Sequence, residues 1–152
     1  MALRLVLLAA AGVASLAYLA LRPKTTPELS REVDLASLER HLDNWLPKLP
    51  FVPFIRIGTP DTGYLKITGD DTTVRMHLLP IADPGIERLF RHTCRELALQ
   101  VHEARVNNRI PDLYCEMRSH TTTVAPALDT LLRDVFDVHD RSRLVAIVPG
   151  DS

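Results

Sequence analysis

Histidines, cysteines and carboxylates are the side chains of this sequence that can bind metals or act in catalysis. His92 and Glu96 are four residues apart, a spacing that places both on one side of a helix and suits a metal ion. A zinc site needs three or four ligands, and the sequence spacing fixes no third one. We therefore predict no metal site and no cofactor. The histidines are scattered along the chain: His41, His77, His92, His102, His120 and His139.

Local nucleophile motifs are also missing, although residues typical of hydrolases stand side by side at Ser119-His120 and His139-Asp140. Adjacent residues in a strand point to opposite faces, so these pairs do not face each other. Cys94 is also not predicted to be a nucleophile with His92 as its base, because residues two apart on a helix do not face each other. We predict no catalytic residues from these motifs.

An enzyme built from residues distant in sequence is the alternative that stays open. His77, Glu116 and His120 are the residues we select for it, since a dispersed site leaves no local signature. A structure that brings the three groups within hydrogen-bond reach would favour this alternative.

Polar residues in the predicted strands form the surface that we expect to bind a partner. Apolar and polar side chains alternate along residues 63–68, 72–79 and 113–118, so the polar ones share one face of a sheet. Arg and Tyr anchor many protein interfaces. A one-sided antiparallel sheet also exposes a polar face to water, which is the competing interpretation. The predicted binding face contains Arg56, Tyr64, Lys66, Arg75, His77, Tyr114 and Arg118, with Glu116 among them.

The two cysteines, Cys94 and Cys115, are both expected to point into the core, one from a helix and one from a strand. They can form a disulfide if the compartment is oxidising and their Cα atoms come within about 7 Å. Two ordinary buried thiols are the alternative.

The length and charge of the chain exclude several classes of protein. A chain of 152 residues has room for one domain after an N-terminal segment. The formal net charge is -1, from 18 Lys and Arg against 19 Asp and Glu, which disfavours nucleic-acid binding. With 46% hydrophobic residues, the chain can bury a core.

The hydrophobic periodicity predicts helices and strands that alternate along residues 34–152. We expect helices over residues 35–46, 84–104 and 124–138, with Asp34 and Asp83 as N-caps. Strands are expected over residues 54–57, 63–68, 72–79, 113–118 and 144–148. The predicted class is α+β: an N-terminal apolar helix followed by a two-layer sandwich, in which helices cover one face of a mainly antiparallel sheet.

An apolar segment from Leu5 to Leu21 contains no charged residue and is bracketed by Arg4 and Arg22. Its length is at the short end for a membrane-spanning helix, which needs about 20 residues. We divide the chain into residues 1–22, a transmembrane anchor or signal segment; residues 23–33, a linker; and residues 34–152, a single α+β domain. Cleavage as a signal peptide, followed by secretion, is the alternative.

From the sequence we expect a membrane-anchored, non-enzymatic interaction domain of the bacterial cell envelope. We expect a single pass through the inner membrane, a periplasmic domain and a protein partner in the envelope. Basic residues on the two sides of the segment are balanced, so a cytoplasm-facing domain stays open. An assembly or accessory factor and an inhibitor or immunity-type protein both fit this expectation, and the oligomeric state is not predicted.

Overall fold

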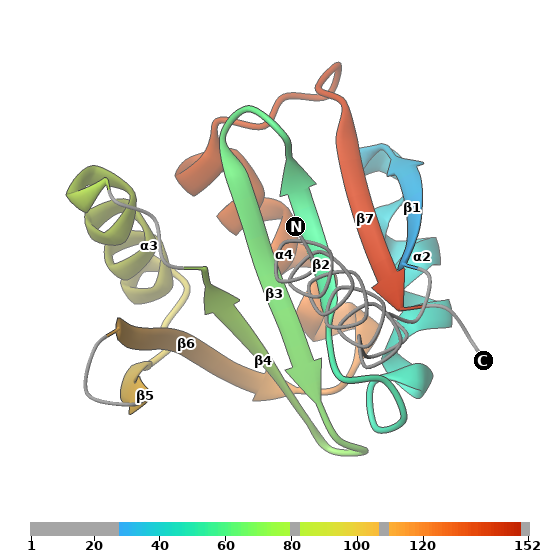
Figure 1. Cartoon of the computed structure of the whole chain (residues 1–152), viewed down its shortest axis with the longest axis horizontal. Coiled ribbons are helices and arrows are strands. Elements are labelled where there is room, and N and C mark those ends of the chain that lie inside the picture. Colours follow the sequence, from blue (N-terminus) through green and yellow to red (C-terminus); the bar gives the residue numbers. More distant parts are fainter. Residues whose placement is uncertain (1–27, 80–82, 107–109, 150–152) are drawn as a thin grey trace, which may run out of the picture.

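A seven-stranded antiparallel sheet carries the fold (Figure 1). The computed structural model describes residues 28–79, 83–106 and 110–149, and the predicted class of α+β with an antiparallel sheet is confirmed. The strand order across the sheet is β1-β7-β2-β3-β4-β6-β5. The strands are β1 (Glu28–Val33), β2 (Ile55–Thr59), β3 (Gly63–Gly69), β4 (Thr73–Leu78), β5 (Val101–Val106), β6 (Ile110–Arg118) and β7 (Leu144–Pro149).

The two faces of the sheet differ in chemistry, as the alternation in the sequence predicts. One row of cross-strand neighbours is fully apolar and buried, running Ala146, Ile57, Leu65, Leu78 and Leu113. The next row, one residue along each strand, carries polar side chains on the opposite face. The apolar face of the sheet forms one side of the hydrophobic core.

Three α-helices pack against this apolar face. In Figure 1, α2 and α4 lie behind the strands and α3 lies at the left of the view. They are α2 (Leu38–Trp45), α3 (Pro84–Glu96) and α4 (Thr121–Phe136), and short 3-10 turns η1 (Leu35–Ser37) and η2 (Leu46–Lys48) flank α2. Helix α4 contacts both other helices and supplies seven buried side chains, so it is the centre of the helical layer. We call the other side of the sheet, turned away from these helices, the outer face.

Both predicted helix caps are present. The carboxylate of Asp34 accepts a hydrogen bond from the Ser37 amide at 2.7 Å, and that of Asp83 accepts one from the Gly85 amide at 2.8 Å. Pro84 occupies the first turn of α3, where its missing N–H costs nothing. These caps fix where the chain enters the helical layer.

Two strands lie where the sequence predicts other structure. Residues 28–33, expected to be linker, form β1 and pair with β7 at one edge of the sheet. The predicted helix over residues 84–104 ends at Glu96, and Val101–Val106 form β5 at the other edge. Leu97 and Val101 suggested that the helix continues because they keep helical spacing, but both instead lie in the turn and the strand that follow.

The end of α3 is a Schellman motif without glycine. The Leu99 amide donates to the Cys94 carbonyl at 2.8 Å and the Ala98 amide to the Arg95 carbonyl at 3.0 Å. Ala98 has φ 55°, a left-handed conformation that usually selects glycine. The usual sequence signal for a helix end is therefore absent here.

The predicted apolar segment at residues 5–21 lies outside the described residues, as does most of the predicted linker. In residues 28–79, 83–106 and 110–149, no helix is long and apolar enough to cross a membrane.

Candidate binding face of the sheet

A single row of cationic and aromatic side chains crosses five neighbouring strands on the outer face. The register pairs Arg56 with Lys66, Lys66 with His77, His77 with Tyr114, and Tyr114 with His102. Side chains at directly opposed positions lie about 5 Å apart at Cβ, so these residues are neighbours on the outer face. We call these five residues the central row: Arg56, Lys66, His77, Tyr114 and His102.

The aromatic half of the central row is a stack. The ring centroids of His77 and Tyr114 are 5.1 Å apart, and those of Tyr114 and His102 are 5.2 Å apart. Such aromatic pairs add stabilisation beyond the area that they bury. The stack holds these rings in fixed positions across β4, β6 and β5.

The cationic half of the central row shares one aromatic ring. The Arg56 guanidinium carbon lies 4.7 Å from the centroid of the Phe54 ring, and Lys66 Nζ lies 5.7 Å from it. Both distances fit cation–π contacts. Two cations therefore stand next to each other on β2 and β3.

Arg56 has an unsatisfied donor. Its Nε atom is buried and has no hydrogen-bond partner among the described residues. A buried polar group without a partner costs roughly 1 to 3 kcal/mol, more when it is charged. The Arg56 side chain therefore keeps one donor without an acceptor in the described structure.

His77 is the most buried polar member of the row, with 8% of its surface exposed. Its Nδ1 atom lies 2.9 Å from Asp112 Oδ1, and its Nε2 atom lies 2.8 Å from Thr68 Oγ1. A carboxylate only accepts, so Nδ1–H donates to Asp112, and in a neutral ring Nε2 accepts from the Thr68 hydroxyl. The three side chains form a hydrogen-bonded relay across β3, β4 and β6.

The remaining predicted residues of the binding face lie beside the central row. Arg75 donates from Nε to Glu116 Oε1 at 2.9 Å, and this hydrogen bond raises the pKa of Arg75. Tyr64 is half-buried opposite Gly58, and Arg118 is exposed opposite Thr73. The pairing register thus places all seven predicted residues on one face, and whether they bind a partner stays a prediction.

Sequence reasoning missed four residues of this face: Phe54, Thr68, Asp112 and His102. Thr68 continues the alternation of Tyr64 and Lys66, so its position was available from the pattern. Asp112 lies before the predicted start of its strand, and His102 lies in the segment predicted as helix. Phe54 precedes β2 and is placed by its contacts with Arg56 and Lys66.

The residues selected for a dispersed enzyme site are not brought together. His77 bonds to Asp112 and Thr68, while Glu116 bonds to Arg75. His120 is exposed at the start of α4. Within the described part of the chain, no three His, Cys, Asp or Glu side chains gather to hold a metal ion.

Cys94 and Cys115 are both fully buried and meet between α3 and β6. The neighbouring Cys94 thiol, together with burial, raises the pKa of the Cys115 thiol. Both are free thiols in the structure, and their oxidation to a disulfide stays a prediction.

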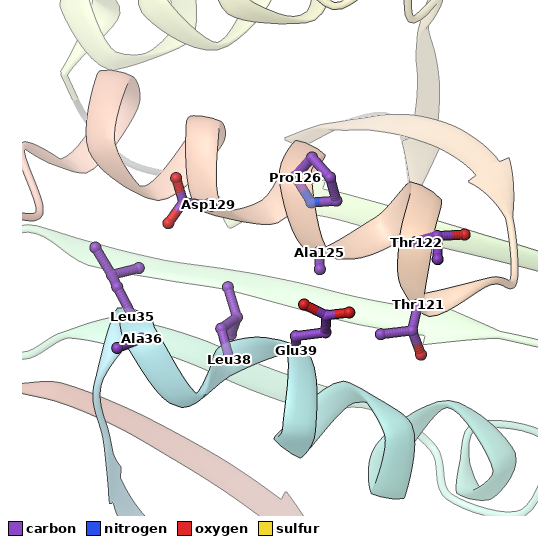
Figure 2. Close-up of a pocket in the computed structure, with 9 residues that line it drawn as sticks. All are labelled: Leu35, Ala36, Leu38, Glu39, Thr121, Thr122, Ala125, Pro126 and Asp129. Atoms are coloured by element: carbon purple, nitrogen blue, oxygen red, sulfur yellow. The ribbon is translucent and has the colours of Figure 1, made fainter.

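Two grooves lie in and beside the helical layer rather than on the outer face. The larger, about 390 Å³, runs between the start of α2 and the first half of α4 (Figure 2). Leu38 and Glu39 line one wall and Ala125 and Pro126 the other. The second groove, about 330 Å³, is lined by His120 together with Asp43, Leu46, Pro47, Pro50, Asp71, Ser119 and Thr121.

Comparison of the chain with protein-family models, with curated proteins and with solved structures gave no match.

Proposed function

We propose that this chain is a non-enzymatic binding domain, attached to a bacterial envelope membrane, that docks an acidic segment of a protein partner on its outer face. The observation that carries the proposal is the central row, which presents cationic and aromatic side chains in one register across five strands. Rigid aromatic rings and arginine side chains are the groups that contribute most to protein interfaces.

The charge pairing within the domain supports an acidic partner. Arg75, Arg91, Arg133 and Arg143 each have a carboxylate partner in their own chain. Among the described residues, the outer-face cations Arg56, Lys66 and Arg118 have no such partner. The same holds for six cations elsewhere in the described residues: Arg31, Arg40, Lys48, Arg88, Arg95 and Arg141. A partner with carboxylates at matching positions would complement these three cations and speed its own association.

The apolar segment Leu5 to Leu21 supports the membrane part of the proposal, because it is uncharged and flanked by arginines. With β1 beginning at Glu28, the proposed linker shortens to residues 23–27. The outer face would then operate close to the bilayer, on a partner in the same envelope compartment.

Affinity capture of the tagged full-length protein from its native membrane tests this function. The test variant combines Tyr64→Ala with Arg118→Glu, because neither side chain makes a hydrogen bond or ion pair in the described residues. Arg75 is not mutated in this test, because it forms an ion pair with Glu116 and its loss could disturb the fold. The matched control combines Arg88→Glu with His92→Ala on the exposed side of α3.

We expect the test variant to capture at least about tenfold less partner, which corresponds to roughly 1.4 kcal/mol of binding free energy. The control should capture as much partner as the unchanged protein. Equal capture by both variants would contradict docking on the outer face.

An envelope enzyme is the second candidate, and the relay of Thr68, His77 and Asp112 is the observation that favours it. Nucleophile, base and orienting carboxylate follow one another as in hydrolases that transfer acyl groups. The relay lies outside both described grooves, however, and a substrate cavity is what such an enzyme needs. Ester hydrolysis by the purified full-length protein that disappears in Thr68→Val would favour this candidate over docking.

A further inference from the structure

We infer that Arg56 and Lys66, above the ring of Phe54, form a binding site for one carboxylate group of the docked partner. This inference rests on the proposed function and assigns one chemical contact within it. The site lies where β2 and β3 run side by side, at the cationic half of the central row.

The first argument is the juxtaposition of like charges. Arg56 and Lys66 are directly opposed in the antiparallel register, a placement that destabilises a sheet when both residues are charged. Phe54 offsets part of the repulsion, because its ring face attracts both cations. An anion between them would offset the rest, so the free site is arranged to accept one.

The second argument is the unsatisfied donor of Arg56. Its Nε–H is buried without an acceptor, whereas Nε of Arg75 in the same sheet donates to a carboxylate. A guanidinium presents its donors as a planar fork that matches a carboxylate in two-point contact. A carboxylate arriving at Arg56 would engage the fork once the side chain moves and uncovers Nε.

The third argument is that the nearby carboxylates of the chain are already engaged. Asp112 accepts from His77, and Glu116 accepts from Arg75. Neither carboxylate takes part in an ion pair with Arg56 or Lys66. Within residues 28–79, 83–106 and 110–149, no carboxylate pairs with this site, which is consistent with an anion supplied by another molecule.

The surroundings favour a carboxylate from protein over a phosphate. Phe54, Tyr64 and Tyr114 lie on the same face, and aromatic side chains of this kind accompany protein contacts. A phosphate-bearing ligand has the same charge preference, so the experiment includes it as a separate arm.

The test follows the arginine Nε–H signals of the ¹⁵N-labelled full-length protein in neutral detergent micelles by NMR. The probe is a blocked diglutamate peptide, and inorganic phosphate is titrated in parallel. Arg56→Gln assigns the Arg56 signal, and the Arg88 signal from the exposed side of α3 is the internal control. Lys66→Gln is compared with Lys48→Gln, which removes an exposed lysine from η2.

We expect the Arg56 signal to shift and saturate with the peptide while the Arg88 signal stays in place. Lys66→Gln should weaken this binding by about tenfold, the effect of losing one charged contact, and Lys48→Gln should leave it unchanged. An Arg56 signal that does not move, or that moves in parallel with Arg88, would overturn the site. Saturation by phosphate at a tenfold lower concentration than the peptide would overturn its assignment to a protein carboxylate.

The two proposals fail in different ways. If the Tyr64→Ala and Arg118→Glu variant no longer captures the partner but the Arg56 signal does not shift with the peptide, docking on the outer face is supported and the carboxylate site is wrong. If Arg56 binds the peptide but capture is unchanged in that variant, the site takes a small anion and docking of a protein is wrong.

Discussion

Side chains on the outer face interact in pairs that the sequence alone does not define. The alternation of polar and apolar residues was enough to place Arg56, Lys66 and Arg75 on one face, because side chains of a strand alternate with period two. The pattern cannot give the register between strands. Register decides that Arg75 meets Glu116 while Arg56 meets Lys66, and so decides which cations are left for a partner.

The buried thiols lead to a prediction at the same scale. The neighbouring Cys94 thiol and burial raise the pKa of Cys115, whereas the Cys115 thiol lowers the pKa of Cys94. Both side chains are fully buried, so the reagent reaches neither sulfur in the folded protein. We expect iodoacetamide to leave the native protein unlabelled and to label both cysteines after unfolding in urea without reductant. Mass spectrometry counts the labels. Rapid labelling of Cys115 in the native protein would contradict its burial, and absence of label after unfolding would indicate a disulfide.

At the scale of elements, helix boundaries are predicted correctly where a capping residue marks them and incorrectly where no such residue is present. Asp34 and Asp83 marked helix starts through their capping side chains. The end of α3 had no glycine or proline to mark it, so the helix was extended over residues that form β5. The sequence does not predict β1, because polar and apolar residues do not alternate along Glu28–Val33.

Ala98 gives an element-scale prediction, because a left-handed residue with a Cβ is strained. Ala98→Gly should raise the free energy of unfolding by about 1 kcal/mol. The measurement is urea unfolding followed by the fluorescence of Trp45, the single tryptophan, which is buried. Gln100→Gly is the control, since it is exposed and does not have positive φ, and it should lower stability slightly. A loss of stability in Ala98→Gly would show that φ 55° is not strained.

At the scale of the whole molecule, the division of faces follows from the helices. Helix α4 covers the centre of the sheet, α2 and α3 lie on either side of it, and all three are on the apolar side (Figure 1). The sequence predicts this arrangement in outline, since three amphipathic helices and a one-sided sheet bury their apolar surfaces best in two layers. It does not predict the strand order, because β7 returns from the C-terminal end of the chain to lie between β1 and β2.

The measurement that tests the central claim most directly is photo-crosslinking of the full-length protein in its native membrane. The photoreactive residue p-benzoylphenylalanine replaces Tyr64 on the outer face in one variant and His92 on the exposed side of α3 in another. We expect a partner to crosslink from position 64 and not from position 92, at a peptide rich in Asp and Glu. Crosslinking from position 92 alone would contradict the assignment of the outer face as the binding surface.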